Sequence, residues 1–225
     1  MIEIKDVTKE YGKIKALDSI NLNFSAGEFV CLVGPSGAGK STLIKLLVRE
    51  EKPTTGQIIV ANRDITKFRF RELPFYRRKI GVIFQDFKLL PQKTVSENVA
   101  FALEVAEASG KDIKTKIPKI IDLVGLSHCA NNYPRELSGG EKQRTAIARA
   151  LVHSPKILIA DEPTGNLDPK NAWEITELLL RINQAGTLVV LATHNKLIVD
   201  KIRKRVVSLR KGKVISDQRV GKYLI

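Results

Sequence analysis

A glycine-rich segment, GPSGAGKST at 34–42, constrains this chain more than any other feature. It follows a continuous apolar run at 29–33 and precedes a helical pattern, LIKLLVRE. A loop between a buried strand and a helix directs backbone N–H groups and the positive end of the helix at one point, which suits an anion. The segment therefore predicts a phosphate-binding loop at the edge of a sheet.

The composition of this loop indicates which phosphates it binds. Its glycines, Gly34, Gly37 and Gly39, permit a tight turn and a close approach of the backbone to the ligand. Lys40 is placed to reach the β- and γ-phosphates, and the Ser41 hydroxyl to ligate Mg²⁺. We therefore expect a nucleoside triphosphate and Mg²⁺, but kinases, GTPases and ATPases all use such a loop.

Four short apolar runs predict the main sheet. Amphipathic segments separate them, and each run is continuous, as in strands buried on both faces. They lie at 28–33, 80–84, 156–160 and 187–192. This pattern is typical of the α/β class, in which helices cover a parallel sheet.

The remaining segments predict two additions to that sheet. Residues 2–8, 20–24 and 57–61 alternate apolar and polar positions, which favours an antiparallel β flank. The later part of the chain carries helical stretches without a strand pattern. We therefore expect a helical subdomain at approximately 86–152, inserted in a single domain, 1–225.

The segment KILIADEPT at 156–164 narrows the chemistry. Its apolar residues carry a strand to Asp161 and Glu162 at the carboxyl end of the sheet, where α/β proteins bind ligands. Asp161 is placed to hold Mg²⁺, and Glu162 to polarise an attacking water. An acidic pair beside Pro163 could instead cap a helix, but the phosphate loop favours hydrolysis.

The segment ELSGGEKQR at 136–144 has two interpretations. Ser138 followed by Glu141 forms a capping box, so it could simply begin a surface helix. Gly139 and Gly140 are poor helix formers, however, and favour a site where backbone amides approach an anion closely.

Together these motifs resemble those of the ABC (ATP-binding cassette) ATPases, whose signature is similar to LSGGE at 137–141. The resemblance covers the whole chain and implies a P-loop NTPase core that hydrolyses ATP. It also implies that Tyr11 stacks on adenine, that Gln85 senses Mg²⁺ and the γ-phosphate, and that His194 contacts the γ-phosphate. The loop GNLD at 165–168 would cross a dimer interface.

The implied site is therefore extensive. Contacts with the nucleotide are implied for Tyr11, Gly34, Pro35, Ser36, Gly37, Ala38, Gly39, Lys40, Ser41, Thr42, Ser138, Gly139, Gly140, Glu141 and Asp168. Contacts with Mg²⁺ are implied for Ser41, Gln85 and Asp161, and catalytic roles for Gln85, Glu162 and His194.

The resemblance also implies a homodimer. In ABC proteins the signature of one chain closes over the ATP held by the phosphate loop of the other. The sequence departs from the usual pattern at Asn195, where Asp is commoner, and at Glu141, where Gln is; neither change removes a catalytic group. His128 and His153 are interpreted as structural.

One stretch of the sequence indicates which branch of the family the chain resembles. RRKIGVIFQDFKLLPQKTVSENVAFALEV at 77–105 closely resembles the cell-division ABC ATPases, as does the segment at 193–214. Those proteins pair with a membrane subunit, and their ATP cycle regulates cell-wall hydrolases. ATPases of lipoprotein-release or macrolide-export transporters share GNLD and are the alternative.

The net charge of +14 gathers in two segments. Residues 63–93 carry nine Lys or Arg against three acids, and residues 196–225 carry ten against two. Such segments could face nucleic acid, an anionic membrane surface or only water. Few aromatic residues interleave with them, and there are no long coiled coils or zinc modules of the kind found in DNA-associated ABC proteins, so we expect no nucleic-acid partner.

The cysteines and the apolar runs indicate where in the cell we expect the protein. Cys31 and Cys129 fit neither a disulfide framework nor a metal-ligand spacing, which suits a reducing cytoplasm. Apolar runs do not exceed five residues, so we expect no membrane span. The expected location is the cytoplasmic face of the inner (plasma) membrane, bound peripherally to a membrane subunit.

Overall fold

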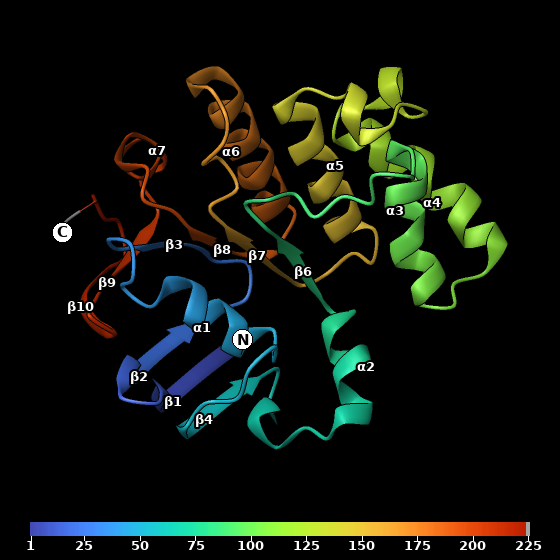
Figure 1. Cartoon of the computed structure of the whole chain (residues 1–225). Coiled ribbons are helices and arrows are strands. Elements are labelled where there is room, and N and C mark those ends of the chain that lie inside the picture. Colours follow the sequence, from blue (N-terminus) through green and yellow to red (C-terminus); the bar gives the residue numbers. More distant parts are fainter. Residues whose placement is uncertain (224–225) are drawn as a thin grey trace.

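The structure, a computed structural model, describes residues 1–223, which form two sheets with helices around them (Figure 1). The main sheet has six strands in the order β10-β9-β3-β8-β7-β6. Five of them run parallel, and β10 pairs antiparallel with β9. The strands are β3 (Phe29–Val33), β6 (Ile80–Ile83), β7 (Ile157–Asp161), β8 (Leu188–Ala192), β9 (Arg205–Arg210) and β10 (Lys213–Gln218).

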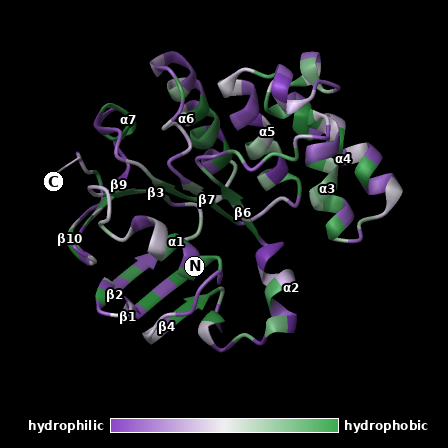
Figure 2. Cartoon of the chain, in the orientation of Figure 1, coloured by the Kyte–Doolittle hydropathy of each residue, from purple (hydrophilic) through white to green (hydrophobic). Residues whose placement is uncertain are grey.

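The second sheet is antiparallel and forms the flank. Its order is β2-β1-β4-β5. The strands are β1 (Ile2–Tyr11), β2 (Ile14–Phe24), β4 (Thr55–Val60) and β5 (Arg63–Asp64). Figure 2 shows β1 and β2 alternating between hydrophobic and hydrophilic residues, because one face packs inward and the other meets water.

Helices cover both faces of the main sheet. The α-helices are α1 (Lys40–Leu47), α2 (Leu73–Arg77), α3 (Val95–Val105), α4 (Gly110–Leu123), α5 (Gly139–Leu151), α6 (Pro169–Gln184) and α7 (Lys196–Ile202). Short 3₁₀ turns are η1 (Ile65–Lys67), η2 (Phe70–Glu72), η3 (Ser127–Cys129) and η4 (Pro134–Glu136).

Strand β3 shows how the core divides into two. Its five residues are all buried, and successive side chains point to opposite faces of the sheet. Val30 and Leu32 join the core formed with α1 and the flank. Cys31 and Val33 join the core formed with the helices α3 to α6. The sheet therefore separates α1 from α5 and α6.

The predicted α/β class, the antiparallel flank and the four apolar strands are confirmed. Strands β1 and β2 are longer than predicted, since their outer residues are exposed and lack an apolar pattern. Strands β9 and β10 were not predicted, because charged residues surround the buried Val206, Val207 and Leu209. The segment 86–152 contains α3, α4 and α5 and no strand; its status as a subdomain stays a prediction.

Among residues 1–223, no helix combines the length and apolarity that crossing a membrane requires.

Candidate functional site

The carboxyl ends of β3, β7 and β8 border a cleft of about 780 Å³. It lies at the edge of the sheet where the motifs predicted a ligand. The predicted site residues that line it are Tyr11, Ser36, Gly37, Ala38, Gly39, Lys40, Ser41, Thr42, Gln85, Glu162 and His194. Residues from five separate segments of the sequence therefore meet in one place.

The glycine-rich loop enters the cleft just before α1. Gly39 has φ +107°, and a Cβ there would lie 2.7 Å from the carbonyl oxygen of Ala16, so only glycine fits. Gly37 also has a positive φ, and a Cβ there would meet open space. The buried Lys40 donates from Nζ to the carbonyl oxygen of Gly34 at 2.7 Å. The loop thus combines an open concave backbone with an ammonium group.

Glu162 is held in an unusual backbone conformation at the end of β7. Its φ is +49°, in the left-handed region that non-glycine residues seldom adopt, and such strain clusters at functional sites. Its Oε1 lies 2.9 Å from Nδ1 of His194 and 3.8 Å from Nζ of Lys40, and its Oε2 accepts from the His194 N–H at 3.3 Å. The carboxylate therefore sits between the Lys40 amine and the His194 imidazole.

Asp161 lies one residue earlier and is more deeply buried. Its Oδ1 has no hydrogen-bond partner among the described residues, although its carboxyl is hydrogen-bonded with Ser41. Burial raises the pKa of this carboxyl, and the Ser41 hydrogen bond opposes that effect. An unpaired buried carboxylate oxygen is costly unless a cation or a donor meets it.

The loop after β6 is fixed by a residue that the sequence analysis missed. Phe87 and Lys88, which follow Gln85 closely, both have positive φ. Arg149 of α5 donates to the carbonyl oxygen of Phe87 at 2.9 Å and to that of Lys88 at 2.5 Å. An arginine 61 residues away left no signal in the sequence, because only the fold brings α5 beside this loop.

The loop GNLD at 165–168 also contacts the loop at Gln85. The side-chain amide of Asn166 donates to the carbonyl oxygen of Gln85 at 3.4 Å. Asp168 lies outside the cleft, where its carboxylate caps α6 by accepting from the N–H groups of Lys170 and Asn171. The structure thus gives Asp168 a capping contact, and its contact with nucleotide stays a prediction.

Tyr11 reaches the cleft from the end of β1. Burial raises the pKa of its phenol to about 12, with Glu51 adding to the effect. Nζ of Lys9 lies 4.8 Å from the centroid of its ring. The ring is partly exposed, so one face of it remains accessible to a ligand in the cleft.

The signature segment lies elsewhere and does not line this cleft. Ser138 and Glu141 form the capping box that begins α5, and the Ser138 N–H donates to Oε2 of Glu141 at 2.8 Å. The hydrogen bonds from Ser138, with His128 adding to them, lower the pKa of Glu141 to about 2. A Cβ at Gly140 would lie 2.6 Å from Oδ1 of Asn171, so packing against α6 explains this glycine without a ligand.

The two remaining histidines differ in their surroundings. His153, as expected, is structural: it is half-buried, its Nε2 lies 3.0 Å from the carbonyl oxygen of Ala102, and burial lowers its pKa. His128 is exposed and pairs with Glu141 at 2.9 Å. The interpretation of His128 as a structural residue therefore does not account for its contact with Glu141 of the signature.

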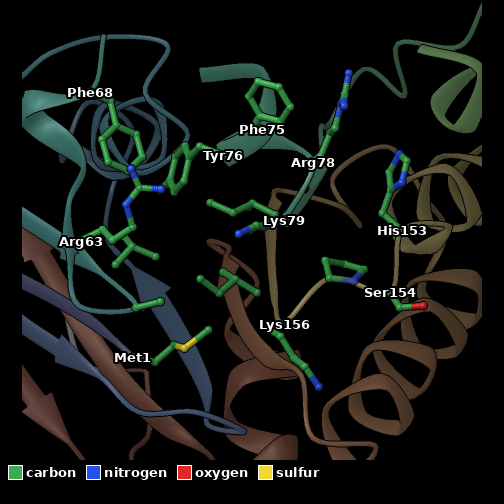
Figure 3. A pocket seen from close by; sticks show the side chains of 15 residues that line it. Met1, Arg63, Phe68, Phe75, Tyr76, Arg78, Lys79, His153, Ser154 and Lys156 are labelled. Carbon is green, nitrogen blue, oxygen red and sulfur yellow. The ribbon is translucent and has the colours of Figure 1, made fainter. Parts of the chain in front are cut away.

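A second pocket, of about 260 Å³, lies at the amino-terminal end of β6 and β7 (Figure 3). Aromatic rings of Phe68, Phe75 and Tyr76 line one side of it. Arg63, Arg78, Lys79 and Lys156 surround it, and the Arg63 guanidinium lies 4.5 Å from the centroid of the Phe68 ring. It contains none of the predicted catalytic residues.

Comparison with known families agrees with the geometry of the larger cleft. The family model of the ABC transporter matches residues 17–165. Because this match covers more than half of the sequence, the chain belongs to the ABC transporter family, and it is an ABC ATPase.

Comparison with individual relatives indicates which members of the family the chain resembles. The chain is 54% identical over 224 residues to the cell division ATP-binding protein FtsE of Bacillus subtilis, which covers 99% of this chain and 98% of that protein. It is 51% identical over 225 residues to FtsE of Mycobacterium tuberculosis, with 99% and 98% covered. The methionine import ATP-binding protein MetN of Geobacillus kaustophilus is 44% identical over 225 residues, which are 98% of this chain and 66% of that protein. The predicted resemblance to the cell-division branch is confirmed.

Solved structures share the fold. The dimeric ATP-binding cassette MJ0796, in a post-hydrolysis state bound to ADP and Pi, has a TM-score of 0.88 and 36% identity, covering 99% of this chain and all of that one. The cbiO1 protein of Clostridium perfringens has a TM-score of 0.90 and 31% identity, covering 97% and 88%.

Proposed function

We propose that two copies of this chain bind two ATP molecules between them and hydrolyse them at composite sites. One observation carries this proposal. The side chains of Lys40, Glu162 and His194 meet in one cleft, whereas Ser138 and the rest of the signature lie outside it. A closed active site therefore requires the signature of a second copy, as the homodimer of the family resemblance implies.

The roles of the cleft residues follow from their chemistry. Backbone N–H groups of the loop and Lys40 bind the phosphates, and Glu162 accepts a hydrogen bond from the attacking water. His194 contacts the γ-phosphate while its ring is oriented by Glu162 at 2.9 Å. Tyr11 stacks on the adenine.

Mg²⁺ fits the oxygen donors beside the phosphate loop. This ion prefers carboxylate, hydroxyl and phosphate oxygens. Next to Ser41, Asp161 offers a buried carboxylate oxygen that has no partner in the part of the chain that the structure describes. The ion would neutralise phosphate charge; Asp161, Ser41 and Gln85 would hold it.

The process served is bacterial cell division. The similarity to FtsE supports an ATP cycle that, with an FtsX-like membrane subunit, controls cell-wall hydrolases. The loop at 86–93 follows Gln85 and would receive the membrane subunit, and Arg149 holds its backbone. The alternative is an ATPase of lipoprotein-release or macrolide-export type.

The location proposed is the cytoplasmic face of the plasma membrane. Arg63, Arg78 and Lys79 of the basic segment 63–93 surround the smaller pocket, and Phe70 and Phe75 are exposed nearby. Basic residues near a membrane attract anionic headgroups by about 1 kcal/mol each. The protein would thus be held at the membrane in two ways: by docking to the membrane subunit, and by an electrostatic attraction to the headgroups that weakens as the salt concentration rises.

The docking proposal is tested by replacing residues 89–93 with a Gly/Ser-rich segment of equal length, which keeps the Phe87 and Lys88 carbonyl groups on Arg149. We expect the purified variant to keep basal ATPase activity, to lose capture of FtsX, and to leave cells dividing poorly as chains or filaments. Replacing the exposed Lys111, Lys114 and Lys116 of α4 with glutamine serves as the control. If division stays normal and lipoproteins instead accumulate in the inner membrane, the transport alternative replaces the division assignment.

A further inference from the structure

The segment before the signature brings three metal-binding groups together. His128 and Cys129 lie on η3, and Glu141 lies in the first turn of α5. Their ligand atoms all lie within 4.8 Å of one another, and Nε2 of His128 is 2.9 Å from Oε1 of Glu141. Imidazole, thiolate and carboxylate are the groups that bind Zn²⁺ in proteins. The spacing of the cysteines did not indicate this site, because the fold brings its third ligand from another helix.

The burial of the three groups suits capture of an ion. Cys129 is only 3% exposed, so its sulfur is shielded from bulk water. The side chain of His128 is 65% exposed and lies at the solvent side. Tetrahedral zinc places neighbouring ligand atoms about 3.3–3.8 Å apart, so the three atoms need to shift by roughly an ångström. The exposed imidazole is free to make that adjustment.

The hydrogen bonds around the three groups also suit a metal ligand. Oε2 of Glu141 accepts from the Ser138 N–H at 2.8 Å and from the Ser138 hydroxyl at 2.6 Å, which leaves Oε1 directed at His128. Hydrogen bonds of this kind orient a ligating carboxylate and raise metal affinity. The Cys129 thiol makes only a weak contact with the carbonyl oxygen of Leu126 at 3.6 Å, which an ion can replace.

We propose that His128, Cys129 and Glu141 bind Zn²⁺, with water completing a tetrahedral set of ligands. Binding releases the proton of the Cys129 thiol, and the thiolate, the imidazole and Oε1 then share the ion. The ion links η3 to the first turn of α5 and so restricts the signature. An effect of this restriction on ATP turnover rests on the proposed function, whereas the binding of zinc does not.

Binding is tested with the reduced, metal-free full-length chain and Co²⁺ as a spectroscopic substitute for Zn²⁺. We expect a thiolate-to-cobalt absorption band that saturates at about one ion per chain and disappears when Zn²⁺ is added. Cys129→Ser, His128→Asn and Glu141→Gln should each weaken Zn²⁺ binding by about 100-fold or more. The matched controls Cys31→Ala and His153→Asn should bind like the parent. Equal Zn²⁺ affinity in Cys129→Ser, or Co²⁺ bound without the thiolate band, would overturn the site.

Turnover separates this site from the proposed function. Zn²⁺ at saturating MgATP should slow the parent chain and leave Cys129→Ser at its own rate. A Glu162→Gln chain should bind Co²⁺ normally, since its defect lies in the cleft. Zinc binding without any change in turnover would refute the link to the signature, whereas failure of Glu162→Gln to impair hydrolysis would refute the catalytic proposal alone.

Discussion

The cleft at the phosphate loop differs from the start of α5, which carries the signature. The difference lies in how many of their polar groups have hydrogen-bond partners. Beside the cleft, Asp161 has an oxygen without a partner among residues 1–223, and Glu162, which lines the cleft, adopts a strained backbone conformation. At the start of α5, Ser138 and Glu141 satisfy each other in a reciprocal cap. Unsatisfied and strained groups are kept where a ligand will stabilise them, whereas a satisfied cap gives a rigid surface. The first region is thus prepared for a ligand, and the second presents the rigid surface that the proposed function requires of it.

The two regions also lie on different sides of the main sheet. Helix α1, after the phosphate loop, packs into the core formed with the flank, and α5 packs into the opposite core. Within one chain, Arg149 of α5 contacts the loop that follows Gln85, and Gln85 lines the cleft. This loop therefore lies between the cleft and the signature helix.

The largest effect is expected from the cleft itself. Glu162→Gln should lower ATP turnover by about 10²- to 10⁴-fold, because the amide cannot accept a proton from the attacking water. MgATP binding should persist, so gel filtration should show an accumulated dimer. Glu104→Gln, an exposed glutamate on α3, is the control. A variant that stays monomeric in saturating MgATP would count against the shared site.

A mixture of two inactive chains tests whether the regions serve one site across two copies. Lys40→Ala removes the ammonium from the cleft, and Ser138→Ala removes the signature hydroxyl. With random pairing, about half of the dimers are mixed and each has one intact composite site, so about a quarter of the parent activity should return. Phosphate release of the mixture, compared with each variant alone, measures this. Inactive mixed dimers, verified by differential tags, would contradict independent composite sites.

A smaller effect is expected from the contact between the regions. Arg149→Ala frees the carbonyl groups of Phe87 and Lys88, so the loop beyond Gln85 should lose its fixed position. Misplacing Gln85 should slow turnover by about tenfold, with ATP affinity little changed. Hydrogen exchange should quicken at 86–93. Arg144 lies on α5 like Arg149, and Arg144→Ala removes a pair with Glu174 of α6. This variant should leave exchange in that loop unaltered.

The two regions were not equally accessible from the sequence. The strand, loop and acidic pair of the cleft are local patterns with a local physical cause, so the α/β fold and the segments at 34–42 and 156–164 could be predicted. The contact of Arg149 with the loop depends on two segments far apart in the chain, which periodicity cannot bring together. The packing of Gly140 on Asn171 is a long-range contact of the same kind.

The smallest effect concerns the signature cap and its dependence on pH. The carboxyl of Glu141 has a pKa of about 2 in the folded chain against an ordinary 4.5, because Ser138 and His128 stabilise its charged form. A lowered folded pKa contributes stability above pH 4.5 that is lost as the pH falls toward 2. Glu141→Gln should therefore cost about 0.3–1 kcal/mol of unfolding free energy near neutral pH, and less and less below pH 4.5. Urea unfolding at a series of pH values measures the difference.

The control is Glu97→Gln, which alters the capping box that Thr94 and Glu97 form at the start of α3, where no histidine pairs with the glutamate. This substitution should lower the free energy of unfolding by less than Glu141→Gln does. A cost for Glu141→Gln that grows as the pH falls would mean that the carboxylate does not stabilise the cap.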